Sequence, residues 1–152
     1  MKLYQQPMNQ KLAQIAIIVN DYDEAIKFYS KALELNPDFY LAANNLGLVY
    51  SYMGDFNSSV FYLKKAVGID PKLSKAHNDL GTVYAELGRF DEAIAEIKKA
   101  IEINPYNADY YYNLAVIYEF LEENEKAKEL LMKGLEIEPS NEKIKEKLHE
   151  AN

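Results

Sequence analysis

Four prolines recur along this chain at a constant interval of 34 residues: Pro37, Pro71, Pro105 and Pro139. Each lies two residues after a leucine or isoleucine, as in Leu35-Asn36-Pro37. A fixed period of this length predicts a solenoid, in which each unit buries its apolar face only by stacking on its neighbours. The repeats are predicted at 6–39, 40–73, 74–107 and 108–141, and they leave 142–152 as a tail.

Within each repeat, apolar residues fall at helical spacing on either side of a break. In the third repeat the first stripe ends at Leu87, Gly88 interrupts it, and a second stripe begins at Phe90. This pattern predicts a helical hairpin in each repeat. The proline then ends the second helix, because it lacks an N–H group and clashes with the preceding turn.

The turn inside each predicted hairpin has its own residue preferences. Gly54 and Gly88 can adopt the left-handed conformation that ends a first helix. Asp21, Asp55 and Asp91 follow the break, where a carboxylate can accept bonds from free amides and favours the helix dipole.

Small residues recur where the paired helices should approach most closely. Large residues alternate with them and should fill the space between repeats. The small positions are Gly47, Gly81 and Ala115 in the first helices and Ala25, Ala93 and Ala127 in the second; the large ones are Tyr50, Tyr84 and Tyr118, with Tyr29, Leu63, Ile97 and Leu131.

These residues resemble the tetratricopeptide repeat family. The pattern is carried by Leu80-Gly81-x-x-Tyr84, Gly88-Arg89-Phe90-Asp91-Glu92-Ala93, Lys99-Ala100 and Pro105, and it covers about nine-tenths of the chain. The resemblance implies an all-α fold, a right-handed α-solenoid of four helical hairpins in one domain, 1–152, with 142–152 as a capping helix. The sequence departs from the family pattern at Ala16, Ser59, Gly68 and Gly134.

The residues needed for catalysis or metal binding are scarce. The chain has no cysteine and only two histidines, of which His77 is expected to be packed and His149 lies in the polar tail. It also lacks a glycine-rich phosphate loop and a calcium loop. We therefore predict a non-catalytic protein with no metal and no cofactor.

Charge and hydropathy restrict the partners. The 24 acidic side chains against 17 basic ones give a net charge of -7, which disfavours nucleic acids. The longest apolar run, Ile15–Val19, is far short of the roughly 20 residues that span a bilayer. The segment Met1–Pro7 lacks the features of a signal peptide. We expect no direct membrane insertion, and a cytoplasmic location by default.

The resemblance implies that the first helices line a concave groove that binds another polypeptide, so the expected partner is a protein or peptide. Carried over position by position, the predicted binding residues are Asn44, Asn45, Leu48, Tyr52, Lys75, Asn78, Asp79, Thr82, Asp109, Tyr112, Asn113, Val116 and Phe120.

A row of asparagines stands out in this set. Asparagine offers both a donor and an acceptor, so such a row can pair with the main chain of an extended peptide. The alternative is that these side chains only cap or solvate helix surfaces. The row comprises Asn44, Asn45, Asn78 and Asn113, interrupted by Asp79.

The predicted groove also has a polarity gradient. Its amino-terminal half is apolar and its other half is charged, which suits a partner with an apolar anchor and some basic residues. The apolar residues are Ile17, Ile18, Leu41, Leu48 and Tyr52, and the charged ones are Lys75, Asp79, Glu86, Asp109 and Glu119.

Two alternatives remain open. The first helix of the first repeat is apolar on nearly every side, so Ile15, Ile17 and Ile18 could form a self-association surface of a homodimer or a larger structural assembly. The chain could instead be the regulatory domain of a larger protein.

Members of the family that capture the acidic carboxyl terminus of heat-shock chaperones use a clamp of lysine, asparagine, asparagine, lysine and arginine. The matching positions here are Gln10, Gln14, Asn45, Lys75 and Asp79, of which only Asn45 and Lys75 agree. Asp79 would repel the carboxylate that such a clamp neutralises, so we do not expect this specificity.

Overall fold

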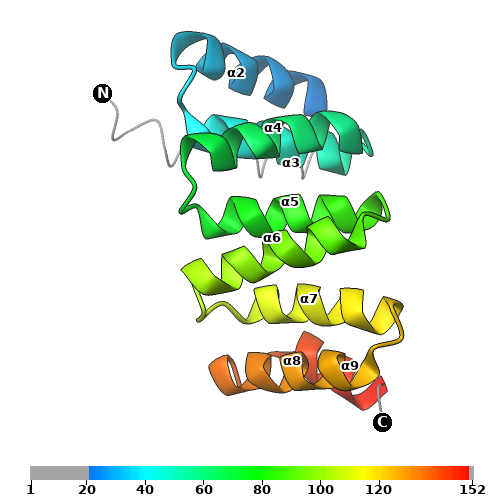
Figure 1. The fold of residues 1–152 in the computed structure, drawn as a ribbon. Coiled ribbons are helices and arrows are strands. Elements are labelled where there is room, and N and C mark those ends of the chain that lie inside the picture. The colour runs from blue at the N-terminus through cyan, green and yellow to red at the C-terminus, as the bar shows by residue number, and fades with distance from the viewer. Residues whose placement is uncertain (1–20, 151–152) are drawn as a thin grey trace.

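The computed structural model describes residues 21–150, which form eight α-helices and no strand within that range (Figure 1). The helices stack one above another from the amino-terminal to the carboxy-terminal end (Figure 1). They are α2 (Tyr22–Leu35), α3 (Tyr40–Tyr52), α4 (Phe56–Ile69), α5 (Ser74–Glu86), α6 (Phe90–Ile103), α7 (Ala108–Phe120), α8 (Asn124–Ile137) and α9 (Glu142–Glu150). This confirms the predicted all-α solenoid.

The helices pair as hairpins and lie in two layers. α3 packs on α4, α5 on α6 and α7 on α8, and each second helix also contacts the first helix of the next repeat. The first helices α3, α5 and α7 contact one another in succession, whereas the second helices in the described range share no comparable contact. We call the surface formed by the first helices α3, α5 and α7 the inner face.

Glycine permits the close approach of paired helices, as the sequence predicted. A Cβ atom added to Gly81 would lie 2.5 Å from Cγ1 of Ile97 and 2.9 Å from the carbonyl oxygen of Ala93. At Gly47 it would lie 2.6 Å from Cγ of Leu63. Any side chain here would push the two helices of the hairpin apart.

The core runs continuously through the second, third and fourth repeats into the capping helix. Leu63, Ile97 and Leu131 of the second helices are buried in it, as are Tyr84 and Tyr118 of the first helices. A second cluster around Tyr29 joins α2 to α3. The alternation of small and large residues therefore forms a packed spine between the layers.

The turns follow the predicted chemistry at two of three sites. The carboxylates of Asp21 and Asp55 cap α2 and α4, accepting hydrogen bonds from the amides of Glu24 and Ser58. The third site differs in detail, because Asp91 lies inside the first turn of α6, where its charge favours the helix dipole but its side chain does not cap the helix.

The left-handed turn position recurs in three repeats. Gly54 and Gly88 have φ angles of 80° and 72°. Glu122 occupies the same place in the fourth repeat and has a φ of 60°. The repeat thus imposes this backbone conformation even where the residue is not glycine.

Two departures from the family pattern have structural roles. The hydroxyl of Ser59 donates a 2.7 Å hydrogen bond to the carbonyl oxygen of Gly47 in α3. At Gly134, an added Cβ would lie 2.7 Å from Cδ1 of Ile144, a fully buried residue of α9. The glycine therefore lets the capping helix seat closely on the last hairpin.

Predictions for the first 20 residues lie outside the described residues. These include Ala16, the clamp positions Gln10 and Gln14, and the self-association surface of Ile15, Ile17 and Ile18. Within residues 21–150, none of the helices combines the length and the apolar character that crossing a membrane requires.

Candidate functional site

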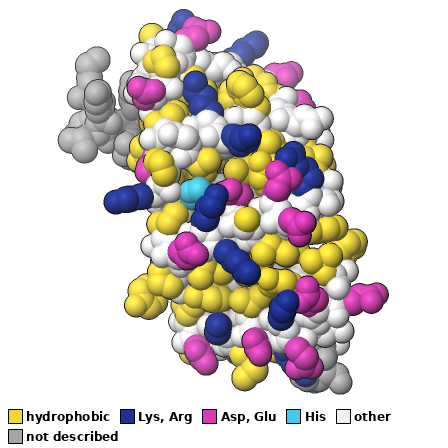
Figure 2. Space-filling model, viewed as in Figure 1, with side chains coloured by type: hydrophobic (Ala, Val, Ile, Leu, Met, Phe, Trp, Pro, Cys, Tyr) yellow, Lys and Arg dark blue, Asp and Glu magenta, His cyan; other side chains and the backbone are white. Residues whose placement is uncertain are grey.

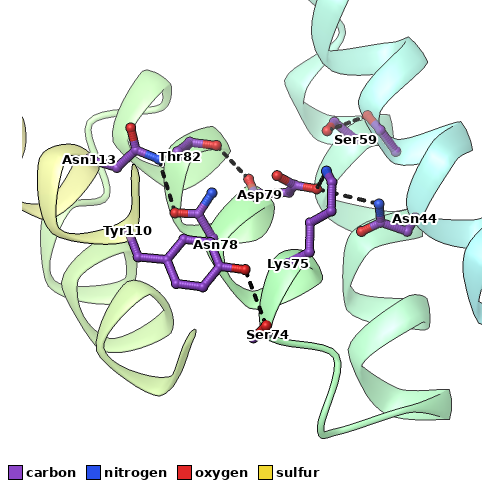
Figure 3. Close-up of polar contacts among 10 residues, drawn as sticks. Asn44, Ser59, Ser74, Lys75, Asn78, Asp79, Thr82, Tyr110 and Asn113 are labelled. Atoms are coloured by element: carbon purple, nitrogen blue, oxygen red, sulfur yellow. Dashed lines mark hydrogen bonds and ion pairs between the residues drawn. The ribbon is translucent and has the colours of Figure 1, made fainter. Parts of the chain in front are cut away.

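The inner face carries a ladder of polar side chains that links neighbouring repeats. The amide of Asn44 on α3 donates to Oδ2 of Asp79 on α5 over 3.4 Å, and the amide of Asn113 on α7 donates to Oδ1 of Asn78 on α5 over 3.0 Å (Figure 3). In both bonds the two residues lie 35 positions apart in the sequence, one more than the length of the repeat. Both bonds therefore join the same two positions of the repeat. The ladder therefore ties the second repeat to the third and the third to the fourth.

The predicted amide row is therefore largely occupied by contacts within the protein. Asn44, Asn45 and Asn78 are buried, Asn44 with only 3% of its surface exposed. Two buried polar atoms, Oδ1 of Asn44 and Nδ2 of Asn45, have no hydrogen-bond partner. A donor and an acceptor thus lie on adjacent residues of α3, whereas the remaining asparagines serve chiefly to join the repeats.

Asp79 organises the centre of the inner face. Its carboxylate accepts a 2.9 Å bond from Nζ of Lys75, one turn earlier on α5, in addition to the bond from Asn44 (Figure 3). The hydroxyl of Thr82 donates to the main-chain oxygen of Asp79 over 2.8 Å. The charge of Lys75 is therefore already balanced within the protein.

Apolar side chains on the inner face form two stripes, one on α3 and one on α7. On α3, Leu48 is half-buried and Tyr52 is 56% exposed. On α7, Val116 and Phe120 are 38% and 70% exposed. The polarity gradient stays a prediction, because its charged residues lie on α5 and α7 and two of its apolar residues, Ile17 and Ile18, lie outside the described residues.

The stripe on α7 continues toward its amino-terminal end. Tyr112 is half-buried, with Nζ of Lys143 lying 3.8 Å from the centre of its ring. Phe120 packs on Phe90, with the ring centres 5.0 Å apart. Asp109 is exposed at the start of the helix. The stripe thus has one aromatic ring covered by a cation and one open to solvent.

The two tyrosines that precede Tyr112 in the sequence make contacts within the protein. Tyr110 is buried, and its hydroxyl lies 3.1 Å from that of Ser74 (Figure 3). The hydroxyl of Tyr111 donates to the carbonyl oxygen of Pro105 over 3.0 Å.

His77 is buried and fully engaged, which confirms the packed role predicted for it. Its Nδ1 lies 2.6 Å from Oε2 of Glu96, and its Nε2 lies 2.9 Å from the carbonyl oxygen of Pro71. Burial raises the pKa of Glu96, but hydrogen bonds from Lys99 and His77 lower it by more, so the pKa lies below its ordinary value. Neither ring nitrogen of His77 is free to act on a substrate.

A cavity of about 270 Å³ lies where α7, α8 and α9 meet. Lys147 on its wall pairs with Glu119 over 2.8 Å and with Glu150 over 3.5 Å, so the three charged side chains of the lining contact one another. Among residues 21–150, no cluster of side chains has the composition of a metal site. The cavity is lined by Glu119, Asn124, Ala127, Leu131, Lys147 and Glu150.

Exposed apolar residues also occur on the second helices. Phe61 on α4 is 65% exposed and Met132 on α8 is also exposed. Figure 2 shows hydrophobic side chains gathered in a band across the visible face at the level of α7. A test of the inner face therefore needs a control on the second-helix layer.

Comparison with protein families decides the identity of the fold. One TPR repeat model matches residues 18–54 and 81–119, and a second tetratricopeptide repeat model matches 41–73 and 108–141. The chain belongs to the tetratricopeptide repeat family. TPR domains are protein–protein interaction modules and are generally non-catalytic scaffolds. A search of curated protein sequences gave no significant match.

Solved structures agree with this assignment. A crystal structure of MamA is 29% identical, covers 91% of this chain and 81% of its own, and has a TM-score of 0.81. A thermophilic TPR protein of Thermus thermophilus is 21% identical with a TM-score of 0.84, covering 92% of this chain and 77% of its own.

The first TPR of Spaghetti (RPAP3), bound to the HSP90 peptide SRMEEVD, is also similar in fold. It is 21% identical with a TM-score of 0.70, covering 74% of this chain and 89% of its own.

Proposed function

We propose that this TPR protein is a non-catalytic interaction module that binds a segment of a partner protein on its inner face. The observation that carries the proposal is the pair of solvent-exposed aromatic side chains there, Tyr52 on α3 and Phe120 on α7. Aromatic side chains that are open to solvent are common anchors of protein interfaces.

The remaining predicted binding residues differ in what they can offer. Leu48, Thr82, Tyr112, Val116 and Asp109 retain exposed surface, and they can contact a partner directly. Asn78 and Asp79 are buried and hydrogen-bonded within the ladder, so their role in the proposal is to hold the inner face in shape.

The ligand class is not an acidic carboxyl terminus. Such a ligand needs a cationic clamp, and Lys75 is paired with Asp79 at its centre. An incoming carboxylate would meet the charge of Asp79 and would have to break this pair. The peptide bound by Spaghetti (RPAP3) is therefore not the model for this partner.

The proposal is tested by affinity capture from a lysate of the source organism, with quantitative mass spectrometry. Three baits are compared: the intact chain, a Tyr52→Ala/Phe120→Ala variant, and a control Phe61→Ala/Met132→Ala variant of the second helices. Circular dichroism checks that each variant keeps its helicity. Partners lost only from the inner-face variant support the proposal; partners lost only from the control variant refute it.

Self-assembly through the apolar segment of Ile15, Ile17 and Ile18 stays a separate prediction. It is checked by sedimentation velocity over a wide concentration range. A mass equal to one chain at every concentration would exclude the homodimer.

A further inference from the structure

Three equivalent side chains cross the inner face in one row. Tyr52, Glu86 and Phe120 are spaced 34 residues apart and each occupies the last position of its first helix, α3, α5 or α7. All three are exposed to solvent. Since α3 contacts α5 and α5 contacts α7, the row runs across the helices in the order aromatic, acid, aromatic.

The two aromatic side chains of the row differ in their contacts with the rest of the protein. The ring of Phe120 leans on Phe90, with ring centres 5.0 Å apart, yet it remains 70% exposed. Tyr52 is 56% exposed and has a hydroxyl at its tip. Each therefore presents apolar surface that a partner's side chain can cover.

The middle of the row is a charge that the protein leaves free. Glu86 forms no ion pair within the described part of the chain. Three lysines near the inner face already have partners there: Lys75 pairs with Asp79, Lys147 pairs with Glu119, and Lys143 lies over the ring of Tyr112. The net charge of -7 adds to the attraction for a cation at this point.

The spacing of the row fixes the length of a ligand that reaches both ends. Packed helices lie about 8–10 Å apart, so two steps separate Tyr52 from Phe120 by roughly 20 Å. An extended chain rises about 3.3 Å per residue, so roughly six residues bridge this distance. Because alternate side chains of an extended chain share a face, a residue that meets Glu86 must lie two or four positions after the first anchor.

We propose that the row Tyr52–Glu86–Phe120 selects an extended partner segment with two apolar anchors six residues apart and a lysine or arginine between them, on the same face. The inference rests on the proposed function and adds the chemistry of the partner. The preference for a basic residue distinguishes this inner face from a surface that binds acidic peptides.

The test is selection of random dodecapeptides displayed on phage against the intact folded chain. Peptides that also bind the Tyr52→Ala/Phe120→Ala variant are removed by counter-selection. The expected result is enrichment of sequences with the two apolar positions and a basic residue between them. Enriched sequences without this pattern would overturn the inference and leave the proposed function standing; enrichment of no peptide at all would count against both.

Charge exchange then tests Glu86 itself. In fluorescence anisotropy, replacing the basic residue of a selected peptide by glutamate should weaken its binding by about two- to fivefold, the range expected for one exposed ion pair. The Glu86→Lys variant should reverse the preference between the two peptides. Phe61→Ala serves as the exposed control and should leave both affinities unchanged. An unchanged preference in Glu86→Lys would overturn the role of Glu86.

Discussion

Glu96 and His77 join the two helices of the third hairpin through a partly buried contact, with Oε2 of Glu96 lying 2.6 Å from Nδ1 of His77. Lys99 bonds the other carboxylate oxygen over 2.8 Å, and the carbonyl of Pro71 holds the far side of the imidazole ring. Both ring nitrogens therefore face acceptors, and the carboxylate faces two donors. This arrangement fastens α6 to the start of α5 by polar contacts beside the apolar core.

The first prediction concerns the acid dependence of this contact. Because the pKa of Glu96 is lower in the folded protein, its stabilising effect is full above the unfolded value of about 4.3. The effect is lost as the pH falls through the folded pKa. Glu96→Gln should lower the free energy of unfolding by about 1–2 kcal/mol at pH 7, and the difference from wild type should shrink on acidification.

Urea denaturation between pH 7 and pH 3 measures this difference. The control is Glu102→Gln, an exposed residue of the same helix, which should change stability little at any pH. A loss for Glu96→Gln that stayed constant down to pH 3 would contradict the prediction.

The second prediction compares two glycines in helices. Gly81→Ala should destabilise the protein by about 1–3 kcal/mol, because its methyl group would meet Ile97 and the carbonyl of Ala93. Gly68→Ala should stabilise it by about 0.5–1 kcal/mol, since nothing lies within 4 Å of the added Cβ and alanine favours helix. Thermal and urea denaturation of both variants check the opposite signs. Equal changes in stability for the two variants would show that a methyl group at Gly81 causes no steric clash with the neighbouring helix.

The third prediction concerns the left-handed turn of the fourth repeat. Glu122→Gly should stabilise the protein by about 0.5–1 kcal/mol, because glycine adopts its φ of 60° without steric cost. The same change at Glu125, inside the first turn of α8, should instead destabilise by about 0.5–1 kcal/mol. The pair is measured by equilibrium unfolding in urea. The account of the turn is wrong if Glu122→Gly also destabilises.

The fourth prediction concerns the polar ladder. Asn78→Ala and Asn113→Ala each remove one side of the 3.0 Å bond between α5 and α7. Their effects should not add, with a coupling free energy of about 0.5–1.5 kcal/mol in a double-mutant cycle. If the losses in the free energy of unfolding add within error, the hydrogen bond between the two amides does not stabilise the protein.

Much of the fold could be predicted from the sequence because each local sequence pattern recurs in several repeats. The 34-residue interval located the hairpins, and the small residues Gly47 and Gly81 marked the close contacts. The left-handed turn at Glu122 could have been found in the same way, since it lies 34 residues after Gly88. Its non-glycine side chain concealed the equivalence.

The inner face was harder to predict because its contacts cross between repeats. Asn78 and Asn113 occupy neighbouring positions of the repeat, so the period alone does not pair them. The exposure of Val116 and Phe120, in contrast, agrees with their predicted place among the binding residues. Asparagines that seemed available to a peptide instead hold the repeats together.

The most direct test of the inner face as the binding surface is photo-crosslinking from single sites. A benzoylphenylalanine is introduced in place of Phe120 on the inner face or Phe61 on α4, which are similarly exposed at 70% and 65%. Each folded variant is irradiated in lysate of the source organism, and covalent adducts are compared by mass. We expect a discrete partner adduct from position 120 and none from position 61; the same adduct formed from position 61 alone would contradict the account.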